Sequence, residues 1–101
     1  KEREFGQDHV EVANTLHGLG SVYSALGDYR KAKEKLLHAN GIREREFGAE
    51  HVEVARTLNN LGHVHSDMAD YDAARRLLSR ALAIKERDFG SDHVEAVRTQ
   101  Q

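Results

Sequence analysis

The chain repeats itself with a period of 42 residues. The segments EREFGQDHVEV, EREFGAEHVEV and ERDFGSDHVEA begin at Glu2, Glu44 and Glu86. Positions 1–42 and 43–84 are identical at 22 of 42 places. One short unit cannot bury its own apolar face, whereas copies stacked side by side bury a continuous one. The repeat therefore predicts a row of stacked supersecondary units, and it restricts the fold more than any other feature of the sequence.

A first helix is predicted after the FG-x-[DE]-H segment of each copy, which we expect to form an elbow between copies. Asp8 can N-cap this helix, with Glu11 three residues later as in a capping box. Glu50 and Asp92 stand at the place of Asp8 in the other two copies. Apolar residues then follow at helical spacing, in the first copy Val12, Leu16, Leu19, Tyr23 and Leu26.

A second helix of about 19 residues is predicted in each full copy. Gly27 interrupts the apolar pattern, Asp28 can cap the new helix, and Gly48 is a C-terminal stop signal. Gly20 and Ala32 are small enough for the two helices of a pair to approach closely. The chain has no proline, so helix can form throughout. The tyrosines Tyr23, Tyr29 and Tyr71 and the three phenylalanines match the apolar faces and are expected in the core.

The pattern L-x-x-L-G-x-x-Y-x-x-x-G-x-Y-x-x-A-x-x-x-L-x-x-A, from Leu16 to Ala39, resembles the tetratricopeptide repeat. The 42-residue length and the FG-x-[DE]-H segment resemble the kinesin-light-chain and nephrocystin group of that family. That group commonly has proline after the histidine, whereas this chain has Val10, Val52 and Val94. The resemblance covers the whole chain and implies an all-α fold, a right-handed α-solenoid of stacked antiparallel helix pairs with about five helices.

The resemblance also implies a single domain cut from a longer array. Residues 1–6 are then the tail of a preceding helix, 7–48 the first repeat, 49–90 the second repeat and 91–101 the start of a third. A piece with two and a half repeats could gain stability by end-to-end stacking or by exchange of helices.

In this family the first helix of each pair lines a concave groove that holds a peptide. The corresponding residues are polar, mostly fall on one helical face, and can donate hydrogen bonds to peptide carbonyls or a carboxylate. They are Asn14, His17, Ser21, Ser24, Arg56, Asn59, Asn60, His63, Ser66 and Arg98. The alternative interpretation is a solvated polar face with no ligand.

Composition and spacing argue against several other functions. The net charge is −2 with the signs interleaved, unlike the basic stripe of a nucleic-acid binder. There is no cysteine, and the seven histidines are not spaced as metal ligands, so neither a metal nor a cofactor is expected. The side chains of His63, Ser66 and Asp67 project from one helix side by side, and this arrangement does not form a catalytic triad. The REREFG segments are interpreted as exposed helix ends.

We therefore expect a cytoplasmic protein-interaction scaffold and no enzyme. Its groove would hold an extended or helical segment, preferably an acidic one because Arg56 and Arg98 recur at one repeat position. The alternative is a spacer or self-assembly module that forms homo-oligomers through its exposed solenoid ends. A partner is expected to be a protein or peptide, with neither nucleic acid nor membrane involved.

Overall fold

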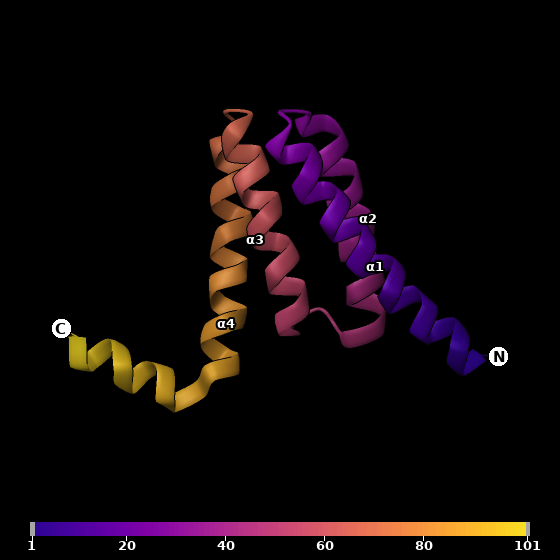
Figure 1. Cartoon of the computed structure of the whole chain (residues 1–101). Coiled ribbons are helices and arrows are strands. Elements are labelled where there is room, and N and C mark those ends of the chain that lie inside the picture. Colours follow the sequence, from indigo (N-terminus) through magenta and orange to yellow (C-terminus); the bar gives the residue numbers. More distant parts are fainter. Residues whose placement is uncertain (1, 101) are drawn as a thin grey trace.

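The computed structural model describes the backbone of residues 2–100 and the side chains of residues 9–88. Within this range there are four helices and no strand: α1 (Glu2–Ala25), α2 (Tyr29–Phe47), α3 (Val52–Asp67) and α4 (Tyr71–Gln100). Figure 1 shows two antiparallel pairs, α1 with α2 and α3 with α4, and α2 packs against α3 between them. The predicted all-α stack of helix pairs is confirmed, and α1 and α4 are the two outer helices of the row.

Helix α2 begins and ends where the sequence predicts. The Asp28 carboxylate accepts a hydrogen bond from the Lys31 amide at 3.3 Å, which satisfies an otherwise unpaired donor of the first turn. Gly27 and Gly48 flank the helix with φ angles of 84° and 97°, a region that glycine enters without a Cβ clash. The helix has 19 residues, as expected.

The middle FG-x-[DE]-H segment forms the predicted elbow, between α2 and α3. His51, and not Glu50, caps α3: its Nδ1 accepts the Glu53 amide N–H at 3.0 Å. The His51 ring also stacks on Phe47, with 4.6 Å between ring centroids. The cap predicted at Glu50 is therefore wrong by one residue, because the imidazole both caps the helix and packs on the preceding one.

The outer two FG-x-[DE]-H segments do not break the helix, although α4 bends sharply toward its C-terminal end (Figure 1). Asp8 lies inside α1 and Asp92 inside α4, so the caps predicted there are wrong, while the four helices are close to the expected number of about five. A helix break leaves backbone donors and acceptors unpaired, and packing must compensate for them. Helix α3 obtains this packing from α2 and α4. Continuing the helix at the outer segments keeps their backbone hydrogen bonds without such packing.

The core consists of small and branched apolar side chains between successive helices. Three buried clusters follow the row from α1 to α4, and their members are Ala13, Ala39 and Ile42; Ala32, Leu36, Leu61 and Val64; and Val54, Ala55, Leu58, Ala81 and Ile84. Tyr23 and Tyr29 pack against the middle cluster, as expected. Tyr71 is 66% exposed and Phe47 is exposed, so their prediction as core residues is wrong. Phe5 and Phe89 lie outside the described side chains.

Glycine allows the two helices of each pair to touch. A Cβ built on Gly20 would lie 2.7 Å from Leu36 Cγ and 3.3 Å from the Ala32 carbonyl oxygen. A Cβ on Gly62 would lie 2.6 Å from Leu78 Cγ. Both distances to carbon are shorter than van der Waals contact, so only glycine fits unless the helices separate. The predicted close approach is thus confirmed in both repeats. Among the described residues, no helix is both long and apolar enough to cross a membrane.

Candidate functional site

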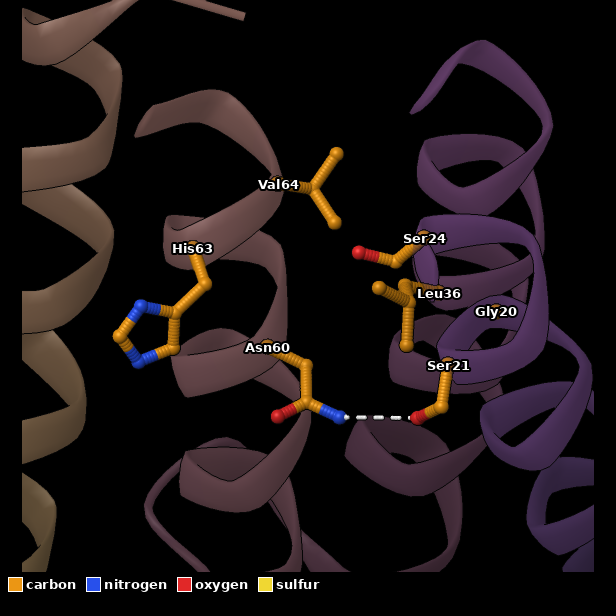
Figure 2. A pocket seen from close by; sticks show the side chains of 7 residues that line it. All are labelled: Gly20, Ser21, Ser24, Leu36, Asn60, His63 and Val64. Carbon is orange, nitrogen blue, oxygen red and sulfur yellow. Dashed lines mark hydrogen bonds between the residues drawn. The ribbon is translucent and has the colours of Figure 1, made fainter. Parts of the chain in front are cut away.

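A pocket of about 180 Å³ opens between the first helices of the two repeats. Figure 2 shows Ser21 and Ser24 of α1 opposite Asn60 and Val64 of α3, while the His63 ring points away from α1. The lining residues are Gly20, Ser21, Ser24, Leu36, Asn60, His63 and Val64. The pocket therefore combines an apolar floor with polar walls, which is the usual composition of a ligand site.

Four of the predicted groove residues line this pocket: Ser21, Ser24, Asn60 and His63. The other predicted residues lie elsewhere. The exposed Asn14 and the half-buried His17 belong to a network beside the pocket that is buried at Arg43 and Thr57, and Arg56 lies further along α3, paired with Glu53. Asn59 and Ser66 are half-buried on α3 outside the pocket lining, and Arg98 lies outside the described side chains.

Arg43 is the centre of the buried network. Its side chain is 2% exposed, and its guanidinium bonds to both repeats. Nη1 lies 2.8 Å from His17 Nδ1 and donates to Thr57 Oγ1 at 2.6 Å, while Nη2 donates to Asn14 Oδ1 at 2.9 Å. The Glu53 carboxylate lies 3.9 Å from Nη2 and supplies the opposite charge. One cation from α2 thus joins α1 of its own repeat to α3 of the next.

The network holds the Asn60 amide at the pocket. Arginine only donates, so His17 Nδ1 must accept and His17 Nε2 must carry the hydrogen. The Asn60 Nδ2 lies 2.8 Å from this Nε2 and donates to Ser21 Oγ at 3.4 Å (Figure 2). Two N–H groups cannot bond to each other, so a hydrogen bond with His17 requires the flipped amide, with its oxygen toward the ring. In either orientation His17 and Ser21 hold the Asn60 amide at the edge of the pocket.

Burial and neighbouring cations keep His17 neutral. Burial lowers the pKa of His17 below its ordinary value, and the positive charges of Arg43 on α2 and Arg56 on α3 lower it further. The Glu53 carboxylate acts in the opposite direction. Burial also lowers the pKa of Arg43, with Glu53 opposing the change. Arginine nevertheless stays charged near neutral pH, so the neutral imidazole is the form that accepts its hydrogen bond.

The His17 environment predicts a stability change with pH. The unfolded chain takes up a proton near the ordinary pKa of 6.5, whereas the folded chain requires a lower pH. The unfolded state therefore binds more protons below that value. We expect the contribution of His17 to be complete above pH 6.5 and to decline as the pH falls through the window beneath it. Urea unfolding at a series of pH values measures this.

The matched control for the pH series is His17→Asn, because asparagine occupies this repeat position at Asn59. The difference in unfolding free energy between wild type and this variant should shrink as the pH falls below 6.5. A difference that does not vary with pH would show that His17 titrates alike in the folded and unfolded chain.

Sequence reasoning missed Arg43 and Thr57 and assigned the REREFG segment around Arg43 to an exposed helix end. That interpretation is wrong for Arg43, which is among the most buried side chains. A helical signal was present: Arg43 follows Leu36 by seven residues, two turns along the same face. Thr57 carried no comparable signal, because its role depends on where α2 meets α3.

Metal-binding geometry is missing from the described side chains: no group of three or more His, Cys, Asp or Glu residues there could hold an ion. The histidines have local partners instead. His65 Nδ1 lies 3.2 Å from Asp70 and His9 Nδ1 lies 3.6 Å from Glu46. His17 and Asn60 meet across the repeats, while His63 lines the pocket.

Antiparallel helix pairs in a row, with a partly polar pocket between their first helices, define an α-solenoid. Two family models described as tetratricopeptide repeat match the chain, one at residues 38–87 and 53–101 and the other at residues 12–53. The chain belongs to the tetratricopeptide repeat family. Repeats of this family generally mediate protein–protein interactions and act as non-catalytic scaffolds. A search of curated protein sequences gave no significant match.

Proposed function

We propose that this chain is a protein-interaction module that holds an extended or helical segment of a partner in the groove between α1 and α3. The observation that carries the proposal is the pocket with a Leu36 floor and walls of Ser21, Ser24 and Asn60. An apolar floor gains free energy by covering a side chain, and polar walls fix the orientation of the covered segment.

Asn60 supports recognition of a peptide backbone. Its amide is held by contacts to His17 and Ser21, and an amide can donate to a backbone carbonyl or accept from a backbone N–H. A polar group held in place by a buried network needs little reorganisation when a ligand binds, which lowers the entropic cost of binding. The Ser24 hydroxyl is available beside it on α1. The groove is thus suited to a segment that offers acceptors and one small apolar side chain.

We also propose a preference for acidic segments. Arg56 is a cation on this face of α3, and its side chain is 55% exposed. Its guanidinium already donates to Glu53 at 2.9 Å, so the gain from a ligand carboxylate is expected to be modest. In the proposed groove Arg98 would supply a second cation at the equivalent repeat position.

The test begins with a random-peptide display library selected on the immobilised full chain. Synthetic copies of the enriched peptides are then titrated and followed by fluorescence anisotropy. The change Ser24→Trp fills the pocket and is expected to weaken binding by about tenfold or more, equivalent to about 1.4 kcal/mol. Arg56→Glu should weaken binding of acidic peptides more than that of neutral ones, with the difference reduced by salt.

The matched control for Ser24→Trp is Leu37→Trp. Leu37 lies on α2 outside the pocket lining and is 51% exposed, so a new indole there should leave the affinity unchanged. Equal loss of affinity in both variants, or no loss in Ser24→Trp, would place peptide binding somewhere other than this groove.

Three finer proposals accompany the groove. The repeats would be of the 42-residue kinesin-light-chain type, divided at 7–48 and 49–90, and their period supports this. Groove residues outside the pocket, among them Asn14, Asn59 and Ser66, would contact the more distant parts of a long segment. The setting would be cytoplasmic, in keeping with the lack of cysteine in the sequence.

A further inference from the structure

The outward side of α1 carries an exposed apolar stripe that consists of Val12, Leu19, Val22 and Leu26. Three of its four repeat equivalents are buried, and the fourth, Met68 at the position of Leu26, is 36% exposed. One repeat later, Val54, Leu61 and Val64 are at most 1% exposed. Leu61 and Val64 owe this to α2 of the preceding repeat, whose Ala32 and Leu36 pack against them. The stripe on α1 is therefore one half of an interface that the chain itself contains in complete form.

The other half lies on the outer face of α4, which we define by Tyr71, Leu78, Leu82 and Lys85. Tyr71 and Leu82 are 66% and 54% exposed, and Leu78 is only partly buried. Their equivalents on α2 are Tyr29, Leu36, Asn40 and Arg43, and each is more buried than its counterpart. Leu36 has no exposed surface and Arg43 almost none. Helix α4 thus presents the surface that α2 uses against α3.

We propose that the outer face of α4 docks onto the apolar stripe of α1 in a second copy of this chain, reproducing the α2–α3 interface between molecules. Leu78 and Ala74 would pack on Leu19 and Val22 of the next copy, as Leu36 and Ala32 pack on Leu61 and Val64. This proposal is independent of the groove.

A polar contact favours this occupant over an unrelated apolar partner. Within the chain, Arg43 donates to Thr57 and lies 3.9 Å from Glu53. The docked copies would place Lys85 at the position of Arg43, and Thr15 and Glu11 at the positions of Thr57 and Glu53. A cation, a hydroxyl and a carboxylate would meet again in the same register. Such a match at the interface sets register and partner choice.

The symmetry of the contact determines what it builds. The two surfaces differ and lie on the outer helices of the row, so each copy can dock one neighbour at α1 and another at α4 (Figure 1). A head-to-tail contact of this kind does not stop at a dimer and gives an open chain unless the rotation happens to close a ring.

Light scattering behind size exclusion tests the proposal on the full chain, from low-micromolar to millimolar concentration. The average mass should rise above the 11.4 kDa of one copy and should not level off at a dimer. Val22→Glu and Leu82→Glu each place a carboxylate at an exposed position, so the chain should still fold. Each variant alone should self-associate at least about 100-fold more weakly, because the carboxylate would be buried without a partner.

Mixing the two variants gives the sharpest result. Val22→Glu retains an intact α4 face and Leu82→Glu an intact α1 stripe, so their equimolar mixture should form a 1:1 pair and nothing larger. Leu37→Glu, exposed to a similar degree on α2, should associate like wild type. Lys85→Glu should reduce association, and Glu11→Lys in the same chain should restore it.

Any of three outcomes overturns the proposal: wild type of single-chain mass at every concentration, a Val22→Glu variant that still dimerises alone, or a mixture with no 1:1 pair. A wild type of single-chain mass would indicate that the α1 stripe binds a different partner. The second would indicate a symmetric contact elsewhere on the surface. Circular dichroism of each variant confirms that loss of mass is not loss of fold.

Discussion

Replacing Arg43 by alanine is expected to lower the free energy of unfolding by about 2–4 kcal/mol. The truncation removes a buried cation that joins α1 to α3, and it leaves the buried Thr57 Oγ1 and the half-buried His17 Nδ1 without their donor, whereas the exposed Asn14 can bond to water. A buried acceptor without a donor costs more than the hydrogen bond itself contributed, because it has lost water as well. Urea unfolding followed by circular dichroism gives the change.

Two companion variants separate the charge from the position. Arg45→Ala, two residues away on an exposed part of α2, should change the unfolding free energy by no more than about 0.5 kcal/mol. Arg43→Met keeps much of the buried volume but none of the donors, so its loss should lie between the two. If Arg43→Ala is no more harmful than Arg45→Ala, the network does not stabilise the contact between repeats.

Gly20→Ala is expected to destabilise the chain by about 1–2 kcal/mol, although alanine favours helix by about 1 kcal/mol over glycine. The new methyl would lie 2.7 Å from Leu36 Cγ and 2.9 Å from Leu36 Cδ2, so Leu36 or the whole of α2 must move. Leu36 is completely buried within its cluster, so it cannot move away from the new methyl group without opening a void in the core.

Gly18→Ala is the matched control in the same helix. A Cβ at Gly18 meets no atom within 4 Å, so only helix propensity acts and the chain should gain about 0.5–1 kcal/mol. The two variants should therefore shift the urea midpoint in opposite directions. A shift of the same sign would mean that α1 and α2 can separate at little cost.

Much of the fold follows from local sequence signals. Asp28 and Gly48 bound α2 because a capping side chain and a glycine with positive φ act within one turn of the helix. Gly20 and Gly62 mark the close contact of each pair because they recur among larger residues. Ser21, Ser24, Asn60 and His63 could be placed near one groove from helical spacing and family resemblance alone.

The rest depended on contacts between residues far apart in the chain. The FG-x-[DE]-H segment turns at His51 and stays helical at Asp8 and Asp92, although the three copies are nearly the same. A turn forms only where the reversed helix finds a surface to pack on, and that surface belongs to other helices. Tyr29 is partly buried because it packs against the cluster formed by α2 and α3, whereas its repeat equivalent Tyr71 is exposed.

The sequence by itself determined the helices, their pairing within a repeat and the polar character of the groove, since these depend on residues within a few turns of one another. Only the tertiary structure decided that Arg43 is buried, that the pKa of His17 is lowered and that Asn60 contacts His17 across the repeats. Those properties arise where α1, α2 and α3 meet, and the register between helices of different repeats is set by their packing as a whole.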